Sequence, residues 1–248
     1  MDQNPESSIP PSKIAAEDLD QGIWPEALSR NSPALSAEEQ KRLLRSCVAV
    51  AGLGGLGGHL CLLLARAGVG RLILIDDDDF DETNTNRQPI CTRKALGKAK
   101  ARQAARAVRD ASPFTRAMAR VDRIEEKGAI HIFSGADLIV DGLDNIASRR
   151  AAFAAARTLN APFVHGAVSQ WSGQAATFFP ADHEAFDRLF HNAKEAKEPP
   201  AVLSPAVAVI AGIQAAEAIR ILAGRGPALR GQMIHFDGER VAIRRVNI

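Results

Sequence analysis

The chain has 248 residues, of which 46% are hydrophobic and 24% charged, and its formal net charge is +2. This composition suits one α/β domain with a substantial core, and the small net charge argues against a general binder of nucleic acid. No apolar run reaches the roughly 18 residues of a membrane span, the polar start lacks the apolar core of a secretory signal, and three scattered cysteines suggest no disulfide framework. We therefore expect a cytoplasmic protein.

Strand and helix patterns alternate along most of the chain. Short apolar runs predict strands at 48–51, 72–75, 136–141, 163–166, 174–179, 232–237 and 240–246. Helical patterns, the first opened by the capping pair Ser36 and Glu39, cover 36–46, 59–67, 94–110, 147–159 and 205–223. We therefore expect an α/β fold: a Rossmann-like, doubly wound, mainly parallel sheet with helices on both faces, and antiparallel strands added in the C-terminal half.

Two segments depart from this alternation. Residues 1–25 are polar and proline-rich at their start, and we expect a flexible N-terminal arm followed by one domain over 26–248. Residues 181–203 are charged, contain Pro199-Pro200 and show no steady period, which predicts a mobile segment that crosses the active-site face. Ser204 and Pro205 then look like the N-cap and first-turn proline of the last helix.

A glycine-rich loop lies between the first predicted strand and the next helix. Gly52, Gly54 and Gly57 have the G-x-G-x-x-G spacing, which lets a phosphate approach the backbone at a helix N-terminus. Asp76 ends the following strand, where an acidic residue commonly binds ribose hydroxyls. The pattern predicts a nucleotide site, although glycines needed only for close packing would look the same, and the motif alone would suggest NAD.

The loop after Asp76 favours a triphosphate over a dinucleotide. Arg87 can pair with phosphate oxygens in a fork, and the amides of Asn84 and Gln88 can orient them. Lys100 follows in a basic helix, most of whose charges we take to be a solvated face.

A second polar stretch, Asp141-Gly-Leu-Asp144-Asn145, follows a predicted buried strand. Ligands of doubly wound sheets bind at such carboxyl ends, and a carboxylate here can hold Mg²⁺ against nucleotide phosphates. Residue chemistry alone does not choose between Asp141 and Asp144, and either could merely cap the next helix.

Together these motifs resemble the ThiF/MoeB/HesA superfamily, relatives of the adenylation domain of ubiquitin-activating enzymes. The likeness runs from about residue 30 to the end. The matching stretches are Gly52-Leu-Gly54-Gly55-Leu-Gly57, Asp76 with Asp78, Asn84 with Arg87-Gln88, Gly97-x-x-Lys100, Asp141 to Asn145, Leu203-Ser-Pro205 and Gly212 to Ile219.

This resemblance implies an ATP-dependent adenylyltransferase. Its partner would be a ubiquitin-like sulfur-carrier protein ending in Gly-Gly, whose carboxylate becomes an acyl-AMP as pyrophosphate leaves. A sulfur donor would later convert the acyl-AMP to a thiocarboxylate, in thiamine, molybdopterin or another pathway.

The same resemblance assigns roles to residues. Asp76 would hold the ribose, and Asp144, beside Asn145, would bind Mg²⁺. The phosphate ligands would be Asn84, Arg87, Gln88 and Lys100. Relatives are homodimers in which an arginine near the N-terminus reaches the partner's phosphates. Arg30 is the nearest candidate, although the spacing is two residues shorter than in these relatives.

The chain departs from many relatives in its cysteines. It lacks the two C-x-x-C pairs that bind structural zinc, so we expect no zinc. The segment 181–203 also lacks the cysteine that forms a thioester or persulfide in other members. Cys47 and Cys61 look like inert buried thiols, whereas Cys91, in the loop after Gln88, could be accessible. We therefore expect the chain to adenylate only, with sulfur supplied by a separate donor.

Three other interpretations remain open. The run 83–88 also resembles the tRNA threonylcarbamoyladenosine dehydratases, whose cysteine-bearing segment is missing here. An NAD-dependent oxidoreductase fits the glycine loop, but the absence of tyrosine excludes a tyrosine–lysine proton relay. A non-catalytic scaffold would gain little from Arg87, Lys100 and Asp144. We expect His165, after a strand, to serve packing or loop structure.

Overall fold

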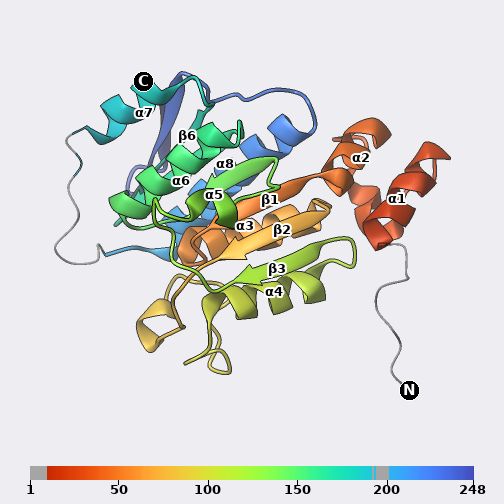
Figure 1. Cartoon of the computed structure of the whole chain (residues 1–248), viewed down its shortest axis with the longest axis horizontal. Coiled ribbons are helices and arrows are strands. Elements are labelled where there is room, and N and C mark those ends of the chain that lie inside the picture. Colours follow the sequence, from red (N-terminus) through yellow and green to blue (C-terminus); the bar gives the residue numbers. More distant parts are fainter. Residues whose placement is uncertain (1–9, 192, 194–200) are drawn as a thin grey trace.

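The protein forms one eight-stranded sheet, as the computed structural model shows for residues 10–191, 193 and 201–248. The strand order is β3-β2-β1-β4-β5-β6-β7-β8 (Figure 1). The first five of these strands are parallel, and each later pair is antiparallel. The strands are β1 (Cys47–Ala51), β2 (Arg71–Ile75), β3 (Arg116–Arg120), β4 (Leu138–Asp141), β5 (Phe163–Ser169), β6 (Ser172–Phe178), β7 (Gln232–Asp237) and β8 (Ala242–Asn247). This arrangement confirms the predicted fold class.

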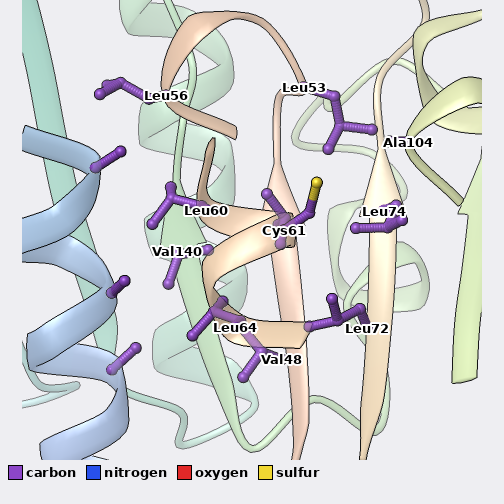
Figure 2. Packing of buried hydrophobic residues seen from close by; sticks show 14 of the residues in the cluster. Val48, Leu53, Leu56, Leu60, Cys61, Leu64, Leu72, Leu74, Ala104 and Val140 are labelled. Carbon is purple, nitrogen blue, oxygen red and sulfur yellow. The ribbon is translucent and has the colours of Figure 1, made fainter. Parts of the chain in front are cut away.

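Helices cover both faces of the sheet because its central strands are buried on both sides. In β1, Val48 and Val50 pack toward α3, α4 and α8, whereas Ala49 and Ala51 pack toward α5, α6 and α7. Figure 2 shows the first of these cores, where Leu60 and Leu64 of α3 lie against the strands. The helices are α1 (Pro11–Asp20), α2 (Ala37–Arg45), α3 (Gly55–Arg66), α4 (Lys100–Ala111), α5 (Ala129–Ile132), α6 (Ile146–Thr158), α7 (His183–Phe190) and α8 (Ser204–Leu222), with 3₁₀ turns η1 (Glu26–Asn31) and η2 (Glu82–Asn84).

The N-terminal region differs from the expected flexible arm. Residues 11–20 form helix α1, whose Ala15, Ala16 and Leu19 are buried against Leu28 and Leu44. The apolar spacing of Ala15, Ala16 and Leu19 explains why the helix docks, since these residues share one helical face. Residues 1–9 of the expected arm lie outside the described part of the chain.

The basic helix begins later than predicted. Residues 94–99 form turns, and α4 starts only at Lys100. Gly97 has a φ of +69°, and the backbone of residues 97–100 pairs with residues 78–80 instead of continuing the helix. The shift matters for the site, because it puts Lys100 in the first turn of the helix.

Further differences lie at element ends. Strand β3 and helices α5 and α7 were not predicted, and α3 begins at Gly55 in place of residue 59. The N-cap of α8 is Leu203, so Ser204 is inside the helix and makes no capping bond. The expected mobile segment 181–203 includes helix α7, and its residues 192 and 194–200 lie outside the described structure.

Helix α8 is long and apolar enough, by composition, to cross a membrane, with a mean hydropathy of 1.5 over its most apolar window. The sequence had suggested no such segment. In the fold, α8 lies against α3, β5 and β6, and Val207, Ile210, Ala211 and Ala218 belong to the core beneath it. Its apolar composition is therefore accounted for by packing within the domain.

Candidate nucleotide site

A pocket of about 360 Å³ opens at the carboxyl ends of β1, β2 and β4. The sheet grows in opposite directions from β1, toward β2 on one side and β4 on the other, so the loops after β1 and β4 separate at this point. The lining includes Gly52, Gly54, Gly55, Asp76, Asp78, Arg87, Gln88, Lys100, Asp144, Asn145 and Arg149. The structure thus brings most of the predicted site residues to one pocket.

The glycine loop makes a tight turn from β1 into α3. Gly52 has a φ of +81°, and a Cβ on Gly57 would lie 1.8 Å from the carbonyl oxygen of Gly52. The helix N-cap, Gly54, has no side chain to accept bonds from the first-turn amides of α3. These donors, together with the positive end of the helix dipole, suit a phosphate.

Asp76 fixes the loop from the end of β2. Its Oδ2 accepts a bond from the Leu53 amide at 2.6 Å, and its Oδ1 accepts one from the Asp78 amide at 2.9 Å. Burial raises the pKa of the Asp76 carboxyl, with nearby Lys100 opposing the shift. Asp76 is therefore both part of the pocket lining and a support of the glycine loop.

Lys100 brings a buried positive charge to the pocket. The lysine is 7% exposed, and its Nζ lies 2.9 Å from Oδ2 of Asp78, whose side chain is mostly exposed. Pairing of residues 78–80 with 97–100 holds the two groups together, since the Lys100 amide also donates to the Asp78 carbonyl at 2.9 Å. The acidic residues 76–78 lie close enough together to share a cation, but Asp76 and Asp78 already have these protein partners.

Arg87 and Gln88 line the pocket as predicted. Nη1 of Arg87 donates to the Thr83 carbonyl and to Asn86 Oδ1, both at 2.9 Å, which fixes the guanidinium while leaving other donors. Gln88 is 6% exposed, and its Oε1 has no hydrogen-bond partner within the described residues. Such a buried, unpartnered amide oxygen in a polar pocket fits contact with a ligand.

Asn84 does not belong to the pocket lining, contrary to prediction. Its Oδ1 accepts from the Asp81 amide at 3.3 Å while Asp81 accepts from Thr83, so the pair caps the short turn η2. Asn84 is 5% exposed because this turn buries it. Its part in the site is to shape the loop that carries Arg87.

The loop after β4 supplies the candidate metal ligand. Asp144 is exposed at the pocket, and its Oδ1 accepts a bond from Asn145 at 3.4 Å. Asn145 is also the N-cap of α6 and accepts from the Ser148 amide at 2.8 Å. Asp141, the other candidate, is fully buried behind the loop. An available carboxylate oxygen beside a phosphate pocket fits Mg²⁺, and this structure therefore favours Asp144 over Asp141.

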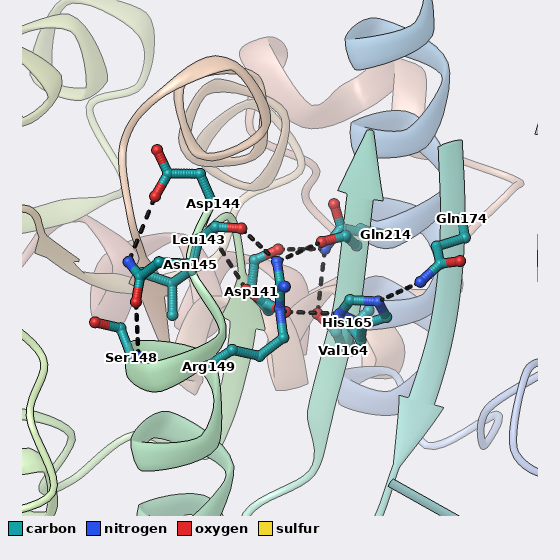
Figure 3. Close-up of polar contacts among 11 residues, drawn as sticks. Asp141, Leu143, Asp144, Asn145, Ser148, Arg149, Val164, His165, Gln174 and Gln214 are labelled. Carbon is teal, nitrogen blue, oxygen red and sulfur yellow. Dashed lines mark hydrogen bonds and ion pairs between the residues drawn. The ribbon is translucent and has the colours of Figure 1, made fainter. Parts of the chain in front are cut away.

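A buried polar cluster of Asp141, Arg149 and His165 lies behind this loop (Figure 3), and of these three residues the sequence had suggested Asp141 alone as a candidate for the site. Oδ2 of Asp141 lies 2.7 Å from Nε of Arg149 and 2.7 Å from Nδ1 of His165. Burial opposes ionisation of Asp141, but Arg149 and His165 hold its pKa below the usual range. Burial lowers the pKa of His165, so the ring favours its neutral form. No local pattern paired Arg149 or His165 with Asp141, because these contacts depend on how α6 and β5 pack against the end of β4.

Arg30 and the cysteines lie elsewhere. Arg30 is in η1, a turn whose Asn31 contacts Gln40 of α2 and the carbonyl of Ala67 at the far end of α3. Arg30 therefore does not reach the pocket of its own chain. Cys91, whose accessibility the sequence left open, is 9% exposed and its Sγ lies 3.5 Å from the Asp81 carbonyl.

Comparison with known proteins agrees with this geometry. The sequence model of the ThiF family matches residues 28–248. Probable adenylyltransferase/sulfurtransferase MoeZ of Mycobacterium tuberculosis is 33% identical over 228 residues, covering 87% of this chain and 57% of MoeZ. The SAMP-activating enzyme E1 of Haloferax volcanii is 35% identical over 205 residues, covering 81% of this chain and 76% of that enzyme. The sulfur carrier protein adenylyltransferase of Thermus thermophilus is 31% identical, covering 87% and 83%.

Solved structures show the same fold. Crystal structures of E. coli MccB with ATP and of PaaA superpose with TM-scores of 0.77 and 0.73, at 21% and 19% identity. The match with MccB covers 90% of this chain and 71% of MccB, and the match with PaaA covers 100% of this chain and 86% of PaaA. At this identity the likeness concerns the fold only. The chain spans little more than half the length of MoeZ, so MoeZ as a whole has additional sequence.

Proposed function

Because the chain belongs to the ThiF family, we propose that it is an ATP-dependent adenylyltransferase. Its substrate would be the C-terminal Gly-Gly carboxylate of a ubiquitin-like sulfur-carrier protein. The observation that carries the proposal is the meeting of Arg87, Lys100 and Asp144 around one pocket that also contains the glycine loop. A binding scaffold has no need for this set of charges, and a dinucleotide-dependent oxidoreductase does not need two cations at the phosphate end.

The relatives support the same reaction class. Three of them are named as adenylyltransferases or as an activating enzyme, and one acts on a sulfur carrier protein by name. The relative from Thermus thermophilus matches along 83% of its length, so the likeness extends over most of that protein.

We assign each residue a task in the reaction. Asp76 holds the ribose, and the first-turn amides of α3, together with Arg87, Gln88 and Lys100, hold the phosphates. A carboxylate oxygen of the carrier attacks the α-phosphorus of ATP. The bond between the α-phosphorus and the oxygen that bridges the α- and β-phosphates breaks, so that acyl-AMP and pyrophosphate form. Fixed donors stabilise the negative charge that grows on the phosphoryl oxygens, and they need no reorganisation during the reaction.

Asp144, beside Asn145, would hold Mg²⁺ in this pocket. The ion supplies positive charge that neutralises the phosphates and favours departure of pyrophosphate. Lys100 can act alongside it, since within the described residues the lysine forms an ion pair with the exposed carboxylate of Asp78, and a phosphate would compete for that contact.

The burial of the three cysteines argues against a cysteine intermediate in the reaction. Cys47, Cys61 and Cys91 are all buried, and burial raises the pKa of each one. We therefore propose that this chain forms the acyl-AMP without a cysteine intermediate, and that a separate donor supplies sulfur for the thiocarboxylate. We further propose a cytoplasmic homodimer that needs no zinc and in which Arg30 contacts the partner's nucleotide.

Pyrophosphate exchange into ATP tests the substrate class. The exchange is measured with Mg²⁺ and a panel of Gly-Gly carrier proteins, with threonylcarbamoyladenosine-modified tRNA, or with neither. We expect exchange only with a Gly-Gly carrier. Exchange only with the tRNA would indicate a dehydratase-like enzyme, and no exchange in any arm would contradict the proposal.

Two variants test the site. Arg87→Ala and Asp144→Ala should each lower the exchange rate by about 100-fold, because each removes a fixed charge from the phosphate pocket. Arg157→Ala, on an exposed position of α6, is the matched control and should retain the rate. Circular dichroism checks that all three variants fold. Full exchange in both pocket variants would mean that the site is wrongly placed.

A further inference from the structure

Leu143, next to Asp144, is held at both ends of its backbone. Its amide donates to Oδ1 of Asp141 at 3.0 Å, and its carbonyl accepts a bond from Nη2 of Arg149 (Figure 3). The peptide that precedes Asp144 therefore has little freedom to move.

The side chains that hold Leu143 are themselves fixed. Nε of Arg149 lies 2.7 Å from Oδ2 of Asp141, and their side chains are 7% and 0% exposed. His165, also fully buried, contacts the same oxygen through Nδ1, and its Nε2 lies 3.2 Å from Nε2 of Gln174. An ion pair this deeply buried adds little stability over an apolar pair of the same size, because both charges lose water. What it offers here is a fixed geometry.

The cluster lies where β4 and β5 stop pairing. Their ladder ends at Val140 and Val164, and side chains then take over the backbone groups. Nε2 of Gln214 donates to the carbonyls of Asp141 at 2.8 Å and Val164 at 3.2 Å. Arg149 also reaches the Gly166 carbonyl at 3.5 Å. The end of β4 is thus anchored from both α6 and α8.

The anchored loop also touches the glycine loop. A Cβ on Gly142 would lie 2.9 Å from both the Gly52 carbonyl oxygen and the Gly57 amide nitrogen. The Gly142 amide donates to the Ala51 carbonyl at 2.8 Å. Since the two backbones pack directly together, displacement of Leu143 would shift the glycine loop as well as the loop after β4.

We infer that Arg149 is a positioning residue: with Asp141 and His165 behind it, it fixes the Leu143 peptide so that Asp144 presents its carboxylate to a divalent cation. The inference rests on the proposed function, because it takes Asp144 as the metal ligand. Residues that orient a metal ligand commonly change metal affinity when they are replaced, even though they do not touch the ion.

Metal binding in the absence of turnover tests this role. Mn²⁺ binding is measured by electron paramagnetic resonance on the full chain with a non-hydrolysable ATP analogue, and affinity for the analogue alone is measured by calorimetry without metal. Arg149→Lys keeps a positive charge beside Asp141. It lacks the planar guanidinium, which contacts Asp141 through Nε and the Leu143 carbonyl through Nη2. We expect about tenfold weaker Mn²⁺ binding and a smaller loss of affinity for the metal-free analogue, because Arg149 also lines the pocket.

Arg150→Lys is the matched control. Arg150 is the neighbouring residue of α6, and its guanidinium also binds a carbonyl, that of Phe190 at 2.8 Å, outside the pocket. In Arg150→Lys, the affinity for Mn²⁺ and the affinity for the metal-free analogue should both stay unchanged. Hydrogen exchange adds a direct readout: the peptide around 142–146 should exchange faster in Arg149→Lys, while β1 keeps its protection. Equal Mn²⁺ affinity and equal exchange in Arg149→Lys and the unmodified chain would overturn the inference.

Two further variants separate this inference from the proposed function. Asp144→Ala should weaken Mn²⁺ binding, and adding Arg149→Lys to it should weaken binding no further, since Arg149 acts through Asp144. If Asp144→Ala has no effect, both the metal assignment and the role of Arg149 are wrong. If only Arg149→Lys has no effect, the metal assignment stands and the positioning role fails. Should Arg149→Lys not fold, Asp141→Asn takes its place with the same expected result.

Discussion

Cys47, Cys61 and Cys91 are all buried, and burial raises the pKa of each thiol, that of Cys61 to about 12. Only the thiolate reacts rapidly with disulfides. We therefore expect no fast reaction of the native protein with Ellman's reagent at pH 8, and three equivalents after denaturation in guanidinium. Rapid release of one equivalent from the folded protein, lost in Cys91→Ala, would show that the Cys91 loop opens.

The site residues differ in how far sequence could place them. Gly52, Gly54 and Asp76 were found because strand, turn and helix follow one another within about thirty residues of chain. Asn84 caps η2 and is not in the pocket lining, and its predicted phosphate contact stays a prediction, because an asparagine that caps a turn and one that binds a phosphate have the same local pattern. His165 was expected to serve packing or loop structure and is fully buried. Arg149, which lines the pocket, was missed, since its contact with Asp141 depends on how β4 and α6 pack.

Among the elements, the turn into α3 places a strict limit on residue size. A Cβ on Gly57 would lie 1.8 Å from the Gly52 carbonyl oxygen, whereas one on Gly212, exposed in α8, would meet nothing within 4 Å. We expect Gly57→Ala to lower the free energy of unfolding by about 3 kcal/mol, as overpacking forces the backbone apart. Gly212→Ala should raise it by about 0.5–1 kcal/mol, because alanine favours the helix.

Urea denaturation of both variants measures these changes, and ATP binding by calorimetry shows whether the pocket survives. Gly57→Ala should also bind ATP more weakly, and Gly212→Ala should bind it normally. Equal stabilities for the two variants would contradict the described packing of the glycine loop.

The start of α2 contains a pH-sensitive link between distant segments. Glu39 accepts bonds from the Ser36 amide at 2.8 Å and from Nη2 of Arg225, after α8, at 2.8 Å. These bonds, that of Arg225 foremost, lower the pKa of Glu39 from 4.5 to about 2. A lowered folded-state pKa stabilises the fold above pH 4.5, and this contribution is lost as the pH falls toward 2.

We therefore expect Glu39→Gln to be less stable than the unmodified protein at pH 7, and the difference to shrink as the pH falls from 4.5 toward 2. Urea denaturation of both proteins at pH 7 and at pH 2.5 measures the difference in the free energy of unfolding at each pH. A difference of the same size at pH 7 and pH 2.5 would show that the loss comes from capping geometry alone, without the charge.

The element boundaries show what local patterns can and cannot place. The buried parallel strands β1, β2, β4 and β5 were predicted well because buried apolar runs are distinctive. The start of α4 was missed because residues 94–99 have a helical composition, and only the pairing of residues 97–100 with 78–80 and the positive φ of Gly97 exclude a helix there. Strand β3, with arginines at both ends, lacks the apolar run of a buried strand because it lies at the sheet edge.

Over the whole molecule, the two ends of the sheet have different tasks. The pocket lies at the carboxyl ends of β1, β2 and β4, whereas α1 and α2 lie beyond the amino end of β1 (Figure 1). Helix α1 also precedes residue 28, where the match to the ThiF family begins. Substitutions in α1 should therefore change stability without changing the chemistry.

Leu19→Ala tests this separation. Leu19 is 3% exposed in the contact of α1 with α2, so its truncation should cost about 3 kcal/mol and lower the Tm by roughly 9 °C. Ile14→Ala is the matched control, since Ile14 is on the same helix and 47% exposed, and its Tm should change little. At a temperature well below both transitions, each variant should retain the KM for ATP in pyrophosphate exchange, because α1 supplies no pocket residue. A changed KM in Leu19→Ala alone would mean that the docking of α1 is transmitted along β1 to the glycine loop, and that stability and chemistry are coupled across the sheet.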